Sequence, residues 1–134
     1  MKLSEKQAIF SKNIASLIVY ADLLGIDLTF GEAYRTNSQV LLYFFGYKVV
    51  YDGVLGIKLV KYKKLSNTLT GQHPKRLAVD FNFFINGKLT YRYEDTKELG
   101  EFWVSLHDDN RWGGDFNKNG VKDGFVDTPH FEMQ

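Results

Sequence analysis

Two histidines and two acidic residues have the types and the spacing that could hold a catalytic metal ion. His73 precedes a short polar turn and an apolar run that carries Asp80, while Asp127 lies three residues before His130. Two imidazoles and one carboxylate suit a zinc ion that keeps one position open for water. We therefore expect His73, Asp80 and His130 to bind zinc, and Asp127 to remain free as a general base.

A strand over residues 77–84 is the element expected to present Asp80. Its side chains alternate between the two faces of a sheet, so every second residue would be buried on the face that Asp80 does not share. These buried residues are Leu77, Val79, Phe81 and Phe83. Pro74 lacks an amide proton and disfavours a longer strand, so we expect a turn that folds His73 back over Asp80.

Three helices are expected to support this strand. Apolar residues recur at helical spacing over residues 4–24, where Ser4 and Gln7 match a capping box. A shorter helix is expected over residues 36–45, and a longer one over residues 95–106. The first and the last would bury an apolar stripe, and we expect the first to serve as scaffold.

The remaining alternating segments are expected to form short strands. They are residues 26–34, 47–51, 57–62 and 89–93. Asn86-Gly87 suits a tight hairpin turn after the central strand, whereas Arg111-Trp112-Gly113-Gly114 is expected to form a loop. The lysines at residues 61–64 are expected to form a solvated edge. The resulting fold class is α+β, a small antiparallel sheet that carries the zinc site and is flanked by helices.

The length and composition fit one folded domain, residues 1–134, which we expect to be the catalytic domain. Hydrophobic residues make up 44% and aromatic residues 16% of the chain, which favours a buried core over disorder. The 17 basic residues nearly balance the 16 acidic ones, so a nucleic-acid partner is not expected. The absence of cysteine excludes disulfides and thiolate ligands.

No segment of the sequence has the pattern of a membrane span or a secretory signal. The run from Val40 to Phe45 is too short to cross a bilayer, and the first residues lack the apolar core of a signal peptide. We therefore expect a monomer that is made in the cytoplasm and does not insert into a membrane. It would reach an external substrate only after release through a separate pore.

A second metal site is suggested by a polar loop before Asp127. Oxygen-bearing residues alternate there, with glycine at the sixth place, as in the first part of a calcium-binding loop. The expected ligands are Asp115, Asn117, Asn119 and Asp123. The glutamate that closes such loops is missing, so the segment is either a calcium site or a polar turn.

Two further polar residues could assist the zinc ligands. Glu132 lies two residues after His130 and would share its face of a strand, so it could support the ligands or be a surface carboxylate. His107 lies at the end of a predicted helix. It could be a third histidine ligand, but the position is more typical of a surface or helix-dipole residue.

Taken together, these motifs resemble a family of zinc peptidases. The family comprises D-alanyl-D-alanine carboxypeptidases, dipeptidases and phage L-alanyl-D-glutamate endopeptidases. The segments that carry the resemblance are Tyr34-Arg35-Thr36 with Gln39, His73, Ala78-Val79-Asp80, Trp112-Gly113-Gly114 and Asp127-Thr128-Pro129-His130-Phe131-Glu132. The last two are most similar to the endolysin branch. Many members have Ser and Gly where this chain has Gly71 and Arg76.

The resemblance implies a function for the site. The chain would hydrolyse the L-alanyl-D-glutamate bond of peptidoglycan stem peptides, as a phage-type endolysin. Arg35 would stabilise the oxyanion or grip a substrate carboxylate, Gln39 would contact substrate, and Asp127 would move the proton. Cleavage at D-alanyl-D-alanine and a non-catalytic, metal-bound wall-recognition module are the alternatives. A nuclease is disfavoured by the near-neutral charge.

Overall fold

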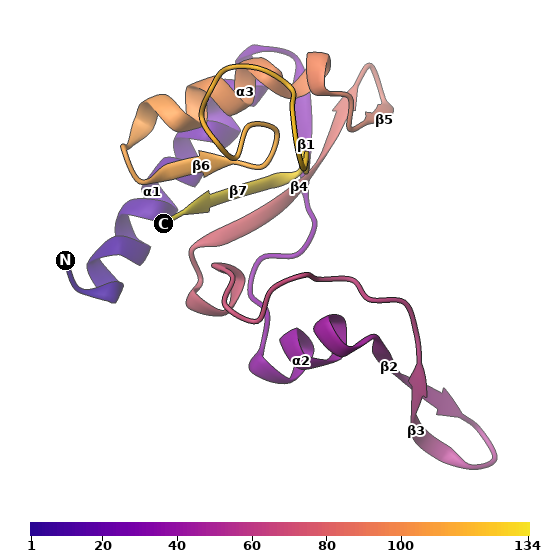
Figure 1. Ribbon diagram of the computed structural model, residues 1–134. Coiled ribbons are helices and arrows are strands. Elements are labelled where there is room, and N and C mark those ends of the chain that lie inside the picture. Colours follow the sequence, from indigo (N-terminus) through magenta and orange to yellow (C-terminus); the bar gives the residue numbers. More distant parts are fainter.

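The computed structural model describes all 134 residues and confirms the α+β class. Figure 1 shows a body of packed helices and sheet, from which an arm projects. The body comprises α1 (Leu3–Leu23), β1 (Ile26–Phe30), β4 (Ala78–Ile85), β5 (Lys88–Thr90), α3 (Tyr93–Leu106), β6 (Asn110–Trp112) and β7 (His130–Met133). The arm comprises α2 (Asn37–Phe45), β2 (Tyr47–Asp52) and β3 (Gly56–Lys61). One turn of 3-10 helix, η1 (His73–Lys75), precedes β4.

β4 is the central strand of the antiparallel sheet. The strand order is β1-β4-β7-β6, and β5 pairs with the end of β4. Asn86 and Gly87 both have positive φ at that hairpin, which is the conformation that an Asn-Gly turn supplies. The predicted small antiparallel sheet and its hairpin are therefore confirmed.

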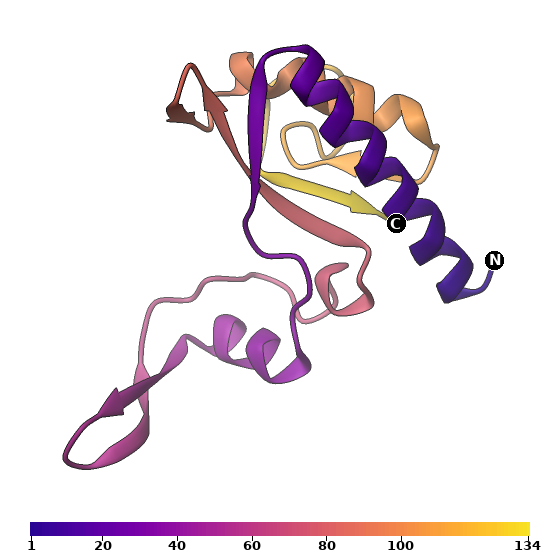
Figure 2. The ribbon, with the colours of Figure 1, turned by 180° about the vertical axis from the view of Figure 1, so that it is seen from behind.

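The helices α1 and α3 contact each other and cover one face of this sheet, as Figure 2 shows from behind. Trp103 of α3 lies at the centre of this layer, edge-on to Phe10 at 5.6 Å and to Phe131 at 6.0 Å between ring centroids. The residues predicted to be buried on β4, which are Leu77, Val79, Phe81 and Phe83, are all buried. Asp80 therefore lies on the sheet face opposite the helices, as its alternation with these residues requires.

The arm lies outside this core. The core cluster contains no residue between Ile26 and Leu77, and β2 pairs only with β3. Figures 1 and 2 both show the hairpin pointing away from the body. The chain leaves the body after β1 and returns to it at η1, so the two connections of the arm flank the same part of β4.

The predicted start of the first helix and the bounds of two predicted strands are wrong. The first helix begins at Leu3, where the Lys2 amide donates to the Glu5 carboxylate at 2.8 Å. The Ser4–Gln7 capping box is therefore absent, and the Gln7 amide donates instead to the carbonyl of Lys75.

The strand predicted over residues 26–34 ends at Phe30, and the strand predicted over residues 89–93 shortens to β5, because α3 begins at Tyr93. Asn110–Trp112 forms the edge strand β6 where a loop is predicted. Its three residues are too few to show an alternation, and only pairing with β7 reveals them as a strand.

None of the helices combines the length and the hydropathy that a bilayer-crossing segment requires.

Candidate functional site

Strand register brings Asp80 and His130 together although 50 residues separate them in the chain. They are direct cross-strand partners in the antiparallel pair of β4 and β7. Directly opposed side chains share one face and lie about 5 Å apart at Cβ. The His130 Nδ1 atom is 3.1 Å from Oδ1 of Asp80. Both side chains project from the sheet face that the helices leave uncovered.

The turn of η1 delivers His73 to the same place. Arg76 adopts a left-handed conformation with φ of 57°, and the Leu77 amide donates back to the Gln72 carbonyl, so the chain reverses tightly before β4. His73 Nδ1 donates to the Ala33 carbonyl at 2.7 Å. Because a carbonyl can only accept, Nδ1 carries a proton, and Nε2 faces Oδ2 of Asp80 at 3.4 Å.

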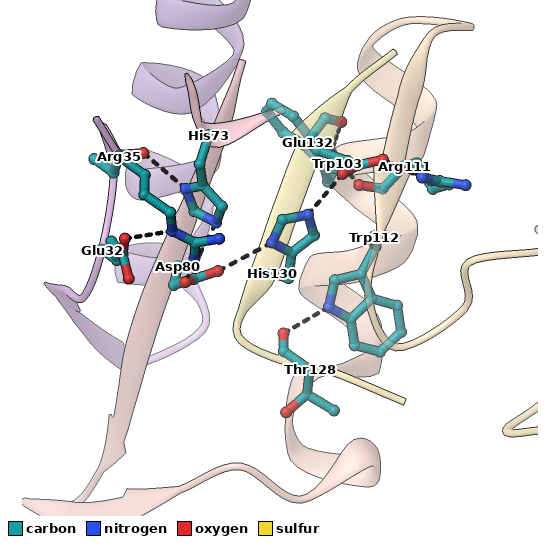
Figure 3. Close-up of polar contacts among 11 residues, drawn as sticks. Glu32, Arg35, His73, Asp80, Trp103, Arg111, Trp112, Thr128, His130 and Glu132 are labelled. Atoms are coloured by element: carbon teal, nitrogen blue, oxygen red, sulfur yellow. Dashed lines mark hydrogen bonds and ion pairs between the residues drawn. The ribbon is translucent and has the colours of Figure 1, made fainter. Parts of the chain in front are cut away.

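His130 is oriented by an ion pair on the neighbouring strands. Its Nε2 lies 2.7 Å from Oε2 of Glu132, and the other carboxylate oxygen of Glu132 accepts from Arg111 Nε at 2.7 Å. Glu132 pairs with Arg111 across β6 and β7, which places both charges on the face of His130. This contact uses Nε2 and directs Nδ1 towards Asp80, as Figure 3 shows. Such carboxylate–histidine contacts are typical of metal centres.

Together the three residues form a compact donor set. One ligand atom each from His73, Asp80 and His130 lies within 4.8 Å of the others. Both histidines are buried and the aspartate is half-buried. The set offers two imidazole nitrogens and one carboxylate oxygen, the donors that zinc accepts. The expectation that these residues meet in space is confirmed, and the identity of an ion stays a prediction.

The electrostatics of the cluster are set by competition between burial and hydrogen bonding. Burial alone would lower the pKa of His130, but its hydrogen bonds to Asp80 and Glu132 outweigh that effect and raise its pKa to about 9. Burial would raise the pKa of Asp80, yet hydrogen bonds from His130 and His73 hold it well below its usual range. Burial would also raise the pKa of Glu132, but its hydrogen bonds and charge interactions with His130 and Arg111 outweigh burial and lower it. Without a metal, the centre therefore holds a charged imidazolium between two carboxylates.

Asp127 is held beside the cluster by its backbone. Its amide donates to the Gly113 carbonyl at 2.7 Å, and the Gly113 amide donates to the His130 carbonyl at 2.7 Å. A Cβ atom on Gly113 would lie 2.1 Å from the Asp127 carbonyl oxygen, so only glycine allows this approach. Trp112 Nε1 donates to the Thr128 carbonyl at 2.8 Å and secures the same turn. The Trp-Gly-Gly segment thus positions the loop that leads into His130.

The Asp127 carboxyl has the character of a base. Burial raises its pKa, His130 opposes the shift, and the negative charge of Asp80 adds to it. It makes no side-chain hydrogen bond within the chain. A carboxylate with a raised pKa is better matched to proton transfer near neutral pH than an ordinary one.

Arg35 follows β1 on the other side of the site. Its Nε donates to Glu32 Oε1 at 2.6 Å, and its guanidinium stacks 4.9 Å from the ring centre of Tyr43. The charge of Arg35 acts on the Asp127 carboxyl, and Figure 3 shows the side chain extending towards Asp80. Gln39 is half-buried in the first turn of α2, one helical turn before Tyr43. Of the two residues predicted to bind substrate, Arg35 contacts Tyr43 and Gln39 lies on the same helix as that ring.

The calcium-like loop is folded around its own side chains. The carboxylate of Asp115 accepts from the amides of Asn119 and Gly120, at 3.1 and 2.7 Å. Asp123 accepts from the side-chain amides of Asn117 and Asn119, at 3.0 and 2.7 Å. The four predicted ligands thus gather in one loop, and calcium binding there stays a prediction.

Some contributors to the site are not recognisable in the sequence. Arg111 and Glu32 hold Glu132 and Arg35 through ion pairs, the Ala33 carbonyl orients His73, and the Phe116 ring lies 5.8 Å from that of His130. Apart from Glu32, which lies three residues before Arg35, each contact depends on strand register or on where a loop returns. His107, in contrast, lies at the end of α3, where it accepts from the Asp109 amide, and it is outside the cluster.

Comparison with known proteins identifies the fold. No family model matches the sequence, and no curated protein matches it. Among solved structures, the chain is similar to the Serratia marcescens L-Ala D-Glu endopeptidase ChiX. The TM-score is 0.57 at 16% identity, over 100% of this chain and 87% of that chain. At this identity the likeness shows a shared fold, so the chemistry must be argued from the site.

Proposed function

We propose that this protein is a zinc-dependent peptidase that hydrolyses the L-alanyl-D-glutamate bond of peptidoglycan stem peptides. The observation that carries the proposal is the convergence of His73, Asp80 and His130, with ligand atoms within 4.8 Å of one another. It is supported by the fold, which is shared with an L-Ala D-Glu endopeptidase. The phage-lysin role remains an expectation from the sequence resemblance.

The residues fit a zinc ion by their donor chemistry. His73 can offer Nε2 to a metal because Nδ1 donates to Ala33, and His130 can offer Nδ1 because Nε2 is engaged by Glu132. Zinc binding to nitrogen and oxygen donors with one position open would lower the pKa of water to about 7 and polarise a carbonyl group. The remaining chemistry is assigned to residues of the chain.

Asp127 is the residue suited to move the proton. As water attacks the scissile carbonyl carbon, the Asp127 carboxylate accepts its proton, and it returns that proton to the amine nitrogen as the C–N bond breaks. The raised pKa of this carboxyl supports both halves of the exchange. Its backbone contacts to Gly113 keep it beside His130 throughout.

Arg35 is the residue suited to meet negative charge on the substrate. Its Nε is bound to Glu32, whereas the two terminal nitrogens of the fork have no hydrogen-bond partner within the chain. These donors can stabilise an oxyanion or bind a D-glutamate carboxylate. Gln39, one helical turn before Tyr43 in α2, is proposed to contact the peptide beside Arg35.

Metal content tests the ligand assignment. Purified protein is expected to hold one zinc ion per chain, and His130→Ala should lose it together with all peptidase activity. The matched control is His107→Ala, which removes a histidine outside the cluster and should keep both. Full zinc occupancy in His130→Ala would contradict the assignment.

Digestion of purified peptidoglycan tests the bond that is cut. Mass spectrometry should find stem peptides with a new N-terminal D-glutamate. Release of terminal D-alanine alone would identify a carboxypeptidase instead. Binding to the wall without any released fragment would leave only a recognition module.

A further inference from the structure

The tip of the arm carries large apolar side chains in solvent. Tyr51, Val54, Leu55 and Ile57 expose 80, 92, 74 and 75% of their surface. They occupy the β2–β3 turn and the second cross-strand pair behind it, in which Tyr51 opposes Ile57. Single exposed apolar residues are common, but a contiguous group at a projecting tip marks an interaction surface.

The same apolar surface continues along one face of the hairpin. Val49 and Leu59 oppose each other in the next pair on that face, and both are more than half exposed. The other face is different, because Val50 and Val60 are half-buried there. The arm thus exposes the apolar residues of one face more fully than those of the other.

The charged residues of the arm are almost all positive. Between residues 37 and 66 there are five lysines, and Asp52 is the only acidic residue. The Asp52 carboxylate is engaged within the turn, where it accepts from the amides of Val54 and Leu55 and pairs with Lys58 at 3.9 Å. The five lysines are Lys48, Lys58, Lys61, Lys63 and Lys64. None of them lies in the turn itself, and Lys58, next to Ile57, is the lysine nearest to it.

We propose that the arm docks peripherally on an anionic lipid bilayer. The tip would enter the interface, and the lysines would contact the lipid head groups. Lys58 lies three residues behind Leu55, which is roughly 10 Å along a strand, and apolar groups of interfacial segments enter about 5–10 Å. Lys48 and Lys64 lie over the rings of Tyr62 and Phe44, at 4.3 and 4.1 Å, so they cover apolar surface while keeping their charges in water. The proposal does not depend on the peptidase activity.

Other occupants of this surface fit less well. A second copy of the chain would bring two lysine-rich arms together, and lysines along a free strand edge oppose strand pairing. A polyanionic wall polymer would be attracted by the lysines, but it offers nothing to the exposed apolar tip. A bilayer with anionic head groups matches both features at once.

Co-sedimentation with lipid vesicles tests the proposal on the full chain. We expect binding to phosphatidylcholine vesicles that contain phosphatidylglycerol, and much weaker binding to phosphatidylcholine alone. Raising salt from about 0.1 M to about 1 M should weaken it, because the Debye length falls from about 10 Å to about 3 Å. Lys48→Ala and Lys61→Ala should each lower the affinity on the order of fivefold.

A tip variant separates lipid insertion from simple charge attraction. Val54→Asp combined with Leu55→Asp should lower vesicle affinity by roughly tenfold or more. The matched control is Leu23→Asp, which alters a residue of similar exposure on the body and should bind like the wild type. If the double variant fails to fold, Tyr51→Trp keeps the proposal testable, since its fluorescence should shift to the blue only with anionic vesicles.

Three results would overturn the proposal. They are no preference for anionic vesicles, unchanged vesicle binding by the tip variant, and a concentration-dependent dimer that the tip variant abolishes. The second result would mean that the arm binds polyanions in general, and the third that it binds a second copy of the chain.

Discussion

The body and the arm are made of similarly apolar sequence, yet they bury it very differently. Fourteen buried hydrophobic residues form the core cluster of the body, and none comes from the arm. In the arm Val40 is the one buried hydrophobic side chain, while Val54 and Ile57 are exposed. The difference arises because β4 has neighbours on both edges and helices on one face, whereas β2 and β3 have only each other and α2. A two-stranded unit cannot bury two faces.

The candidate site lies where these two regions meet. Asp80, His130 and Glu132 stand on strands of the body, while Arg35 lies where the chain leaves for the arm and His73 where it returns. The body therefore holds its part of the site by strand register. The residues of the arm connections are held by side-chain contacts, such as Arg35 with Glu32 and His73 with Ala33.

The largest expected effect concerns a body carboxylate. Asp127→Asn should lower turnover by roughly 10²–10⁴-fold, the usual contribution of a general base, while zinc content and fold are kept. Asp52→Asn, the same change on the arm, should leave hydrolysis of a soluble stem peptide unaltered. Steady-state kinetics check both, and near wild-type turnover in Asp127→Asn would remove it from the mechanism.

The next effect contrasts packing in the two regions. A Cβ atom on Gly100 of α3 would lie 2.1 Å from the Trp112 ring, whereas one on Gly53 of the arm meets nothing within 4 Å. Gly100→Ala should therefore lower the free energy of unfolding by about 3 kcal/mol through overpacking. Gly53→Ala should change it by less than about 0.5 kcal/mol. Urea unfolding measures both, and equal values would break the contrast between the regions.

A smaller effect is a pH dependence of the metal-free body. The pKa of His130 rises on folding from 6.5 to about 9, so protonation favours the folded state. This stabilisation is complete below about pH 6.5 and is lost as the pH rises towards about 9. Thermal unfolding of chelator-treated protein should show the loss, and Glu132→Gln should reduce it. A flat profile across this range would contradict the charged imidazolium.

The smallest expected effect belongs to the calcium-like loop. If the loop binds calcium, the ion should raise the melting temperature by a few degrees, as about 1 kcal/mol of linked binding would. Asp115→Ala should abolish the increment, and Asp22→Ala, on the surface of α1, should keep it. Equal melting curves with and without calcium would leave a polar turn that Asp115 stabilises by its hydrogen bonds.

The sequence by itself determined the local features of the site. The alternation of residues 77–84 placed Asp80 on one face of a strand, Pro74 predicted the turn at His73, and Asn86-Gly87 predicted the hairpin. These predictions held because alternation and turn chemistry depend on neighbouring residues alone. The order of the four candidate site residues, two histidines and two aspartates, was likewise readable in the sequence.

Only the tertiary structure decided which distant groups support these residues. Arg111 reaches Glu132 through the register of β6 and β7, and the Ala33 carbonyl reaches His73 across 40 residues of chain. The tertiary structure also decided that the apolar strands of the arm stay exposed, although their alternation resembles that of a buried strand. A local pattern specifies which face of a strand is apolar, but burial and register depend on what the rest of the chain places against that face.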